Sequence, residues 1–316
     1  MNKNKISIII PCYNGARFLK GTIESVLKQT FKNFTLFLVD NGSTDNSYEI
    51  MKMYRSKDKR IKLIRFKKKT SRAKSINNVI KKKCKSKLIS VLDADDLFFK
   101  NKIYKQIIYL KKNPTVKVLG TLANYINIKN NLTAGISSTN LIYHNSCFKL
   151  IKNNKSIGIV TPSVIFYRDI FLKVGGFRED YWPADDTDLW SRIAQKGYNV
   201  FTLPEILLSY RIHASSITTS NFFYSRLKAM WVKENIFLRN INHKEVSFLK
   251  FKKKIMKKNI FYKFKELIND ISDLYFRNSV IFLINKNYVF FLLNMIISSL
   301  FSPVRFFKKL LNRLKI

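Results

Sequence analysis

A regular exchange of short apolar runs with segments of helical periodicity fills the first third of the chain and constrains the fold more than any other feature. Apolar runs occupy residues 7–10 and 34–39, further strands are predicted at 61–66 and 88–92, and helical spacing covers 18–29 and 71–83. Continuous apolar runs of this length are typical of strands buried on both faces. Strands that alternate with helices predict right-handed βαβ units. The expected fold class is therefore α/β, with a Rossmann-like, mostly parallel sheet flanked by helices.

Beyond residue 100 the pattern is less regular, but further elements are predicted. The expected helices are 102–111 and 186–196, and the expected strands are 116–120, 163–167, 200–203 and 207–212, with a turn at Pro204. From about residue 221 the chain becomes a series of basic, aromatic stretches of helical character. We therefore expect two domains: residues 1–219 form the α/β domain, and residues 220–316 form a helical, basic and aromatic C-terminal extension.

The charge of the chain predicts an anionic partner. It has 59 Lys and Arg against 20 Asp and Glu, a formal net charge of +39. Nucleic acid, an anionic membrane surface and phosphorylated small molecules all suit such a charge. The excess is mainly lysine and is spread evenly, whereas proteins that read bases favour clustered arginine. We therefore do not expect nucleic acid as a partner.

Cysteine usage and the N-terminal segment predict a cytoplasmic protein. Cys12, Cys84 and Cys147 are far apart, and no Cys-x-x-Cys occurs. This spacing argues against a disulfide framework and a zinc site, which fits a reducing compartment. The first apolar run ends at Pro11 and is too short for the core of a signal peptide.

Acidic residues are scarce, so their positions are informative. Ten of the 15 within residues 1–219 lie in three clusters, at 40–45, 93–96 and 179–188. Like charges at this spacing raise one another's pKa unless a cation or hydrogen-bond donors compensate, and a divalent metal is the simplest compensation. Asp40 and Asp93 both follow predicted strands, whose carboxyl ends are where parallel sheets bind ligands, so one crevice is expected to hold both.

The segment Asp93-Ala94-Asp95-Asp96 has the chemistry of a metal site. Alternation after a strand directs Asp93 and Asp95 into the same crevice. One or two carboxylates, completed by substrate phosphates, are the usual ligands of Mg²⁺ or Mn²⁺ on a nucleotide substrate. The alternative is an Asp-rich turn that caps the following helix.

The other two clusters also have structural alternatives. Ser43 or Thr44 is expected to cap the next helix, although a Gly-Ser-Thr turn there also directs backbone N–H groups toward a polar or anionic ligand. Asp185, Asp186 and Asp188 would cap a helix and compensate its dipole. That role accounts for one of these three carboxylates but not for the cluster.

Taken together, these motifs resemble the family 2 glycosyltransferases, which have the GT-A fold. The matching segments are Ser7–Gly15, Glu24–Thr30, Val39–Asp45, Leu92–Asp96 and Asp185–Trp190, and Tyr210-Arg211-Ile212-His213 resembles the end of the catalytic domain. The resemblance covers about residues 5–217 and makes 1–219 the expected catalytic domain. It implies an inverting enzyme that moves a sugar from a nucleotide diphosphate, UDP for preference, to a hydroxyl of a glycan or lipid-linked acceptor in bacterial cell-surface polysaccharide synthesis.

The resemblance also implies a donor site. Pro11, Tyr13 and Asp40 would line the pocket of the nucleotide base, and Asp40 would accept a hydrogen bond from uracil or thymine. Asp93 and Asp95, with Ala94 between them, would form the DxD motif. This motif would hold Mn²⁺ or Mg²⁺ on the donor diphosphate.

Two further roles are implied by the same resemblance. Asp186 would be the general base, and His213 would approach the diphosphate or the metal. The family often has Asp at the position of Asn41 and Glu at that of Asp185. The segment 71–80 lacks the glycine that the family shows there, which leaves the donor-sugar side of the pocket unassigned.

The chemistry of sugar transfer fits this inventory independently. The acceptor hydroxyl needs a base for its proton, and the departing diphosphate needs stabilisation. A metal supplies the second as a Lewis acid. Unlike glycoside hydrolysis, the reaction requires no general acid, so one positioned carboxylate, Asp186, suffices.

The C-terminal extension predicts contact with a membrane surface. Residues 250–258 are a basic run, 289–301 are strongly apolar but short of the ~20 residues that span a bilayer, and 305–315 place basic beside aromatic residues. Such faces suit helices in the interface of an anionic membrane. The expected location is therefore peripheral, at the inner face of the cytoplasmic membrane. The alternative is a helical subdomain that packs on itself or on a second copy, and the oligomeric state is not predicted.

Two other functions are weighed against the transferase. A sugar-phosphate nucleotidyltransferase would share the sheet and the metal, but it needs a Gly-rich basic loop after the first strand, which residues 12–15 do not supply. A non-enzymatic basic module that binds membrane or nucleic acid would not need clustered carboxylates at strand ends.

Overall fold

The chain divides into two compact units. The computed structural model describes residues 6–137, 139, 141–143, 145–213, 221–284 and 286–314. Unit 1 is Met1–Ala123 with Thr139–Tyr210, and unit 2 is Asn124–Ser138 with Arg211–Ile316. The boundary predicted at residues 219 and 220 lies outside the described residues and stays a prediction.

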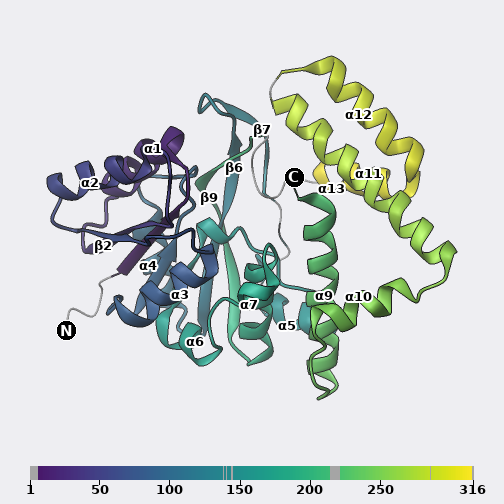
Figure 1. The fold of residues 1–316 in the computed structure, drawn as a ribbon, viewed down its shortest axis with the longest axis horizontal. Coiled ribbons are helices and arrows are strands. Elements are labelled where there is room, and N and C mark those ends of the chain that lie inside the picture. The colour runs from purple at the N-terminus through teal and green to yellow at the C-terminus, as the bar shows by residue number, and fades with distance from the viewer. Residues whose placement is uncertain are drawn as a thin grey trace. The chain divides into compact units, whose positions relative to one another are not determined.

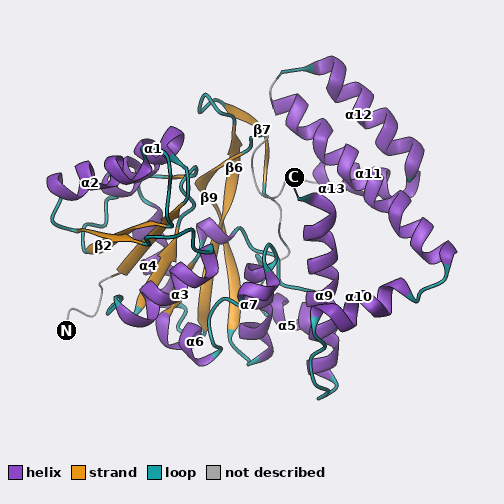
Figure 2. Ribbon diagram, viewed as in Figure 1, coloured by secondary structure: helices purple, strands orange, loops and turns teal. Residues whose placement is uncertain are grey.

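A nine-stranded sheet forms the framework of the protein. Its order is β3-β2-β1-β4-β8-β6-β9-β5, with β7 paired to β6 outside this path. The strands are β1 (Ile6–Cys12), β2 (Phe34–Asp40), β3 (Ile61–Arg65), β4 (Leu88–Val91), β5 (Leu97–Phe98), β6 (Val116–Ile126), β7 (Leu132–Ile136), β8 (Ile165–Tyr167) and β9 (Asn199–Arg211). Figure 2 shows the strands in orange between the helices of unit 1.

The sheet is parallel in its first half and antiparallel in its second. β1 pairs in parallel with β2 and β4, and β2 pairs in parallel with β3. β8 runs antiparallel to both β4 and β6, and β5 runs antiparallel to β9. The predicted α/β class is confirmed, but the expectation of a mostly parallel sheet is wrong, because the sheet is mixed. Its parallel βαβ part is the set β1 to β4, which the alternating pattern of the sequence described.

In the described part of unit 1, seven α-helices cover the two faces of this framework. They are α1 (Ala16–Leu27), α2 (Ser47–Lys57), α3 (Arg72–Lys82), α4 (Lys102–Lys112), α5 (Ser146–Lys152), α6 (Arg168–Lys173) and α7 (Asp185–Gln195). In Figure 1, α1 and α2 lie on one side of the parallel strands, and α3, α6 and α7 lie on the other. The sheet is therefore the middle layer of three.

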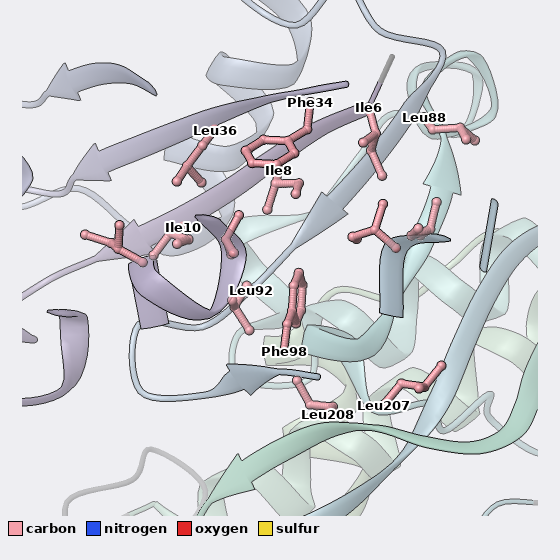
Figure 3. Packing of buried hydrophobic residues seen from close by; sticks show 14 of the residues in the cluster. Ile6, Ile8, Ile10, Phe34, Leu36, Leu88, Leu92, Phe98, Leu207 and Leu208 are labelled. Carbon is pink, nitrogen blue, oxygen red and sulfur yellow. The ribbon is translucent and has the colours of Figure 1, made fainter. Parts of the chain in front are cut away.

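Successive side chains of β1 point to opposite faces of the sheet, so the strand contributes to the core on both faces. Ile6, Ile8 and Ile10 are fully buried and pack with Phe34 and Leu36 of β2 in the core beneath α1, as Figure 3 shows. The opposite face carries an aromatic cluster in which the ring centroids of neighbouring members lie 5.2 to 6.1 Å apart. Its members are Phe166, Phe171, Phe177 and Trp190. This cluster holds α6 and α7 on the face of the sheet opposite α1.

One predicted turn is wrong. We expected Pro204 to separate two strands, but β9 runs unbroken from Asn199 to Arg211. Pro204 is exposed, so its missing N–H leaves no buried hydrogen bond unmade, and proline is tolerated in strands at such positions.

Unit 2 is mainly helical, as predicted for the C-terminal extension. The helices among its described residues are α9 (Phe222–Asn240), α10 (Phe248–Met256), α11 (Ile260–Ile284), α12 (Tyr288–Phe301) and α13 (Pro303–Leu314). Phe276, Val280 and Ile284 of α11 form a small core with Phe306 of α13. Within the described part of the chain, every helix is too short or too polar to cross a bilayer.

Lys102 is a fully buried lysine at the start of α4. Its Nζ donates a hydrogen bond of 2.7 Å to Oε1 of Gln106 and lies 4.1 Å from the centroid of the Phe98 ring. Burial lowers the pKa of Lys102 well below its ordinary value, because an ammonium group loses its hydration in an apolar environment.

We predict that Lys102→Met removes an alkaline pH dependence of stability. The unfolded chain keeps the Lys102 proton up to about pH 10.4, whereas the folded state releases it at lower pH. The unfolded state therefore binds more protons, and the free energy of unfolding rises as the pH climbs toward the unfolded pKa. Urea unfolding at about pH 8 and about pH 10 should show a larger rise for the wild type than for Lys102→Met. Equal rises would contradict a neutral buried lysine.

Candidate active site

The loops that follow β1 and β2 are locked together at the carboxyl edge of the sheet. Asn14 has a positive φ of 52°, and its N–H donates to Oγ of Ser43 at 3.0 Å. The N–H of Thr44 donates to Oδ1 of Asn14 at 2.8 Å. Asp45 accepts from the N–H of Ala16, the first residue of α1, at 3.0 Å. These bonds hold the segments 12–16 and 40–45 as one rigid edge.

The expected capping of α2 by Ser43 or Thr44 is wrong. The helix begins at Ser47, and its N-cap is Asn46. The Ser43 hydroxyl accepts a hydrogen bond from the backbone N–H of Asn14. It therefore connects the loops after β1 and β2 and does not cap a helix.

Asp40 is fully buried at the end of β2, beside the end of β1. Cys12 pairs with Asp40 in the strand register, and Pro11 pairs with Val39. One carboxylate oxygen of Asp40 accepts from the N–H of Ser43 at 2.9 Å, and the other lies 3.3 Å from Nε of Arg65.

Tyr13 follows on the same edge as Asp40. Its side chain is exposed, with Nζ of Lys69 lying 4.6 Å from the ring centroid. The structure therefore brings Pro11, Tyr13 and Asp40 to one strand edge, as the sequence predicted. Their roles stay predictions.

Asp93, Ala94 and Asp95 form the turn after β4, on the strand that flanks β1 on its other side. The Ala94 carbonyl accepts from the Thr22 hydroxyl of α1 at 2.9 Å, which anchors the turn. Partial burial raises the pKa of Asp93, with repulsion from Asp95 and Asp186 in the same direction and Arg72 opposing it. The turn thus concentrates negative charge beside β1.

Arg72, the first residue of α3, is the cation that compensates this charge. Its Nε and Nη2 donate to the same oxygen of Asp93 at 3.0 and 2.8 Å. Burial alone would lower the pKa of Arg72, but attraction from Asp93, Asp185 and Asp186 outweighs it and raises that pKa. Arg72 therefore contacts Asp93 and also attracts carboxylates of a segment about 90 residues further along the sequence.

Asp186 lies at the first turn of α7 with both carboxylate oxygens held. Oδ2 accepts from the Thr161 hydroxyl at 2.7 Å, and Oδ1 accepts from the N–H of Thr187 at 2.6 Å. Nε1 of the buried Trp190 donates to the same Thr161 oxygen at 3.1 Å. This chain of bonds fixes the direction of the Asp186 carboxylate.

Asp185 and Asp188 differ from Asp186 in their surroundings. Asp185 is buried, and burial followed by repulsion from Asp186 raises its pKa to about 7. Asp188 is fully buried and forms ion pairs with Arg178 and Arg192. The residue before α7 is Ala184, and no side chain caps this helix. None of the three is therefore the N-cap, but all three lie in the first turn of α7, as expected for compensation of the helix dipole. Asp188 also ties α7 to the segment that precedes it.

Asn77 has a structural role in the segment whose glycine is missing. Its side-chain amide donates to the Phe177 carbonyl at 2.7 Å and accepts from the Phe177 N–H at 3.0 Å. Gly176 has a φ of +72°, and a Cβ there would lie 2.7 Å from Oδ1 of Asn77. The pair fastens α3 to the segment that leads into α7.

Metal ligands are sparse in the site. Over the described ranges, no group of three or more His, Cys, Asp and Glu side chains is arranged to hold a metal ion. Asp93 and Asp95 supply hard carboxylate oxygens, the ligand type of Mg²⁺ and Mn²⁺. His213 follows β9 and belongs to unit 2, so its predicted approach to the metal stays a prediction.

Sequence reasoning missed Arg72 and Thr161. Most cations of this chain are lysines, so an arginine at the start of the helix after the third strand is unusual. That unusual position was the sequence signal by which Arg72 could have been found. Thr161 lies in a short 3₁₀ turn without periodicity, and no local pattern connects it to Asp186.

We predict that Asp185→Asn changes the pH dependence of stability between about pH 4 and about pH 7. Folded Asp185 keeps its proton up to about pH 7, whereas an unfolded Asp loses it near pH 3.9. The folded state binds more protons in this window, so the free energy of unfolding of the wild type falls as the pH rises. Guanidinium unfolding at several pH values should show the wild type losing stability relative to Asp185→Asn. A constant difference between the two proteins would count against a protonated Asp185.

Comparison with known proteins identifies the family. The sequence profile of Glycosyl transferase family 2 matches residues 7–175. An uncharacterized glycosyltransferase of Methanocaldococcus jannaschii is 28% identical over 256 residues, which cover 78% of this chain and 87% of that protein. The O-antigen biosynthesis glycosyltransferase WbnJ of Escherichia coli is 27% identical over 243 residues, which cover 75% of this chain and 91% of that protein.

Solved structures share the fold. TarS 1–349 of S. aureus, in complex with UDP, superposes with a TM-score of 0.54 at 15% identity, over 93% of this chain and 90% of that chain. The mannosyltransferase PcManGT of Pyrobaculum calidifontis, in complex with GDP-Man and Mn²⁺, gives a TM-score of 0.55 at 16% identity, over 90% and 73%. The mixed sheet between helical layers is that of the GT-A transferases. The chain belongs to glycosyltransferase family 2.

Proposed function

We propose that this glycosyltransferase moves a sugar from a UDP-linked donor to an acceptor hydroxyl with inversion at the anomeric carbon. One observation carries the proposal: the Asp93 turn and the Asp186 helix, distant in sequence, meet around Arg72 at the carboxyl edge of the sheet. Parallel sheets bind their ligands at this edge. Membership of a transferase family also favours this function over the nucleotidyltransferase and the non-enzymatic module.

The donor base is proposed to bind against Pro11, Tyr13 and Asp40. Oδ2 of Asp40 is buried and makes no hydrogen bond to the described residues, although Arg65 lies near it. A buried carboxylate oxygen gains from an N–H donor, and the imide N–H of uracil is such a donor. Like TarS, whose structures hold UDP and UDP-GlcNAc, the chain is proposed to take a uridine nucleotide.

Asp93 and Asp95 fit a divalent metal, Mn²⁺ or Mg²⁺. Two carboxylates on one turn, where burial and then repulsion from Asp95 raise the pKa of Asp93, would leave the remaining positions of such an ion to donor phosphates. When bound, the metal supplies Lewis-acid stabilisation of the departing diphosphate. Arg72 holds Asp93 in place beside it, and His213 is proposed to approach the same group.

Asp186 is proposed to act as the base. Its carboxylate takes the proton from the acceptor hydroxyl as the acceptor oxygen bonds to the anomeric carbon and the bond from that carbon to the phosphate oxygen breaks, releasing UDP. Thr161, Thr187 and Trp190 hold the carboxylate in one direction. A single base on the face opposite the leaving group gives inversion.

The acceptor is proposed to be a glycan or lipid-linked molecule of a bacterial-type surface polysaccharide. WbnJ is named for O-antigen biosynthesis, and a putative glycosyltransferase of Bacillus subtilis, EpsE, is 28% identical over 70% of this chain. Such acceptors are presented at the inner face of the cytoplasmic membrane. The protein is proposed to be cytoplasmic and peripheral to an anionic membrane surface.

We predict that UDP and Mn²⁺ together raise the melting temperature of the wild-type protein. At 100 Kd of ligand the stabilisation is about 2.7 kcal/mol, which is visible in a thermal-shift titration. GDP and ADP with Mn²⁺ serve as the controls for base selection. Equal, metal-independent shifts with all three nucleotides would indicate charge attraction alone and would contradict the proposed donor site.

Asp95→Asn provides the matched test of the metal site. This near-isosteric change removes one carboxylate from the turn, so the Mn²⁺-dependent part of the UDP shift should disappear while the melting temperature without ligand stays within a few degrees. Retention of the full Mn²⁺-dependent shift would contradict the role of Asp95.

A further inference from the structure

Helix α12, which packs against α11 in unit 2, has an inverted distribution of polarity. The buried residues of α12 are Asn294 and Ser298, both polar. The hydroxyls of Ser272 and Ser298 each donate to the backbone carbonyl of the other residue at 2.8 Å. Helices that pack through small hydroxyl residues and interhelical hydrogen bonds are typical of an apolar surrounding.

The opposite side of α12 is an exposed apolar stripe. Its members are Val289, Leu292, Leu293, Ile296 and Leu300, with exposed fractions from 48% to 74%. They recur at spacings of three and four residues and therefore share one face of the helix. A soluble helix normally buries this face and exposes its polar one, so the stripe is suited to a partner that is itself apolar.

Charge identifies the kind of partner. Residues 286–316 contain six Lys and Arg and no Asp or Glu. In α13, Arg305 and Lys309 pair with Asp273 of α11, while Lys308 is exposed beside Phe307. A second copy would bring like charges together, whereas an anionic bilayer offers hydrocarbon to the stripe and negative headgroups to the lysines.

The length of α12 sets how it would sit in a bilayer. Its 14 residues extend about 21 Å at 1.5 Å per residue, less than the ~30 Å hydrocarbon core. The helix is therefore long enough to lie in the membrane interface but too short to cross the bilayer.

We propose that the α12 stripe is a docking surface for an anionic lipid bilayer, on which the protein sits with α12 in the plane of the interface. The proposal rests on the proposed function only for the location of the acceptor. The test measures lipid binding and not turnover. The docking proposal can therefore fail even if the proposed donor site is correct, and the reverse also holds.

The test is co-sedimentation of the full-length protein with vesicles. Wild type should bind vesicles of phosphatidylcholine with about a third phosphatidylglycerol more tightly than phosphatidylcholine alone. Leu292→Glu/Leu300→Glu should lower the partition coefficient on the anionic vesicles by about tenfold or more, because two leucines no longer enter hydrocarbon. The control, Met53→Glu/Tyr104→Glu, makes the same charge change at exposed residues of α2 and α4 and should bind as wild type does.

A second readout guards against a misfolded variant. The natural cysteines are buried, so Ile296→Cys labelled with an environment-sensitive dye should shift its emission to the blue on anionic vesicles, while a label at Met53→Cys should not. Equal vesicle binding by both double variants, or no blue shift at residue 296, would overturn the proposal. So would a wild type that ignores vesicles but forms a dimer that Leu292→Glu/Leu300→Glu abolishes, because the occupant is then a second copy.

Discussion

The ion pair between Arg72 and Asp93 is the interaction on which the site depends. Asp93 and Asp185 lie near Asp186, and burial together with repulsion from Asp186 raises the pKa of both. Arg72 attracts all three, and its two hydrogen bonds fix it to Asp93. The site can therefore hold several carboxylates close together in the free protein, and burial raises the pKa of Asp185 to about 7.

Rigid positioning is supplied by the sheet and its two helical faces. The Asp40 and Asp93 loops flank the end of β1 because β2 and β4 are its parallel neighbours. The aromatic cluster on the far face holds α7, and with it Asp186, through Trp190 and its bond to Thr161. Packing of the core thus determines the direction of the carboxylate proposed to take the acceptor proton.

The sequence could predict the elements and residues that local pattern determines. Apolar runs followed by Asp40 and Asp93 predicted two strand ends at one edge, and the parallel neighbours β2 and β4 confirm that geometry. The partners of Arg72 and Thr161 could not be predicted because they lie 21 and 25 residues away and meet them only through tertiary packing. The strand predicted at 163–167 is present as β8, but β5 is only two residues long, too short for periodicity to define.

The central claim is that Asp186 takes the acceptor proton in a site otherwise able to bind its donor. It is tested most directly by UDP release from a panel of UDP-sugars, measured for the wild type and Asp186→Asn alongside the UDP and Mn²⁺ thermal shift. The account predicts that the variant keeps the shift and loses about 10²- to 10⁴-fold in turnover. Turnover within about threefold of the wild type, with the shift retained, would contradict it.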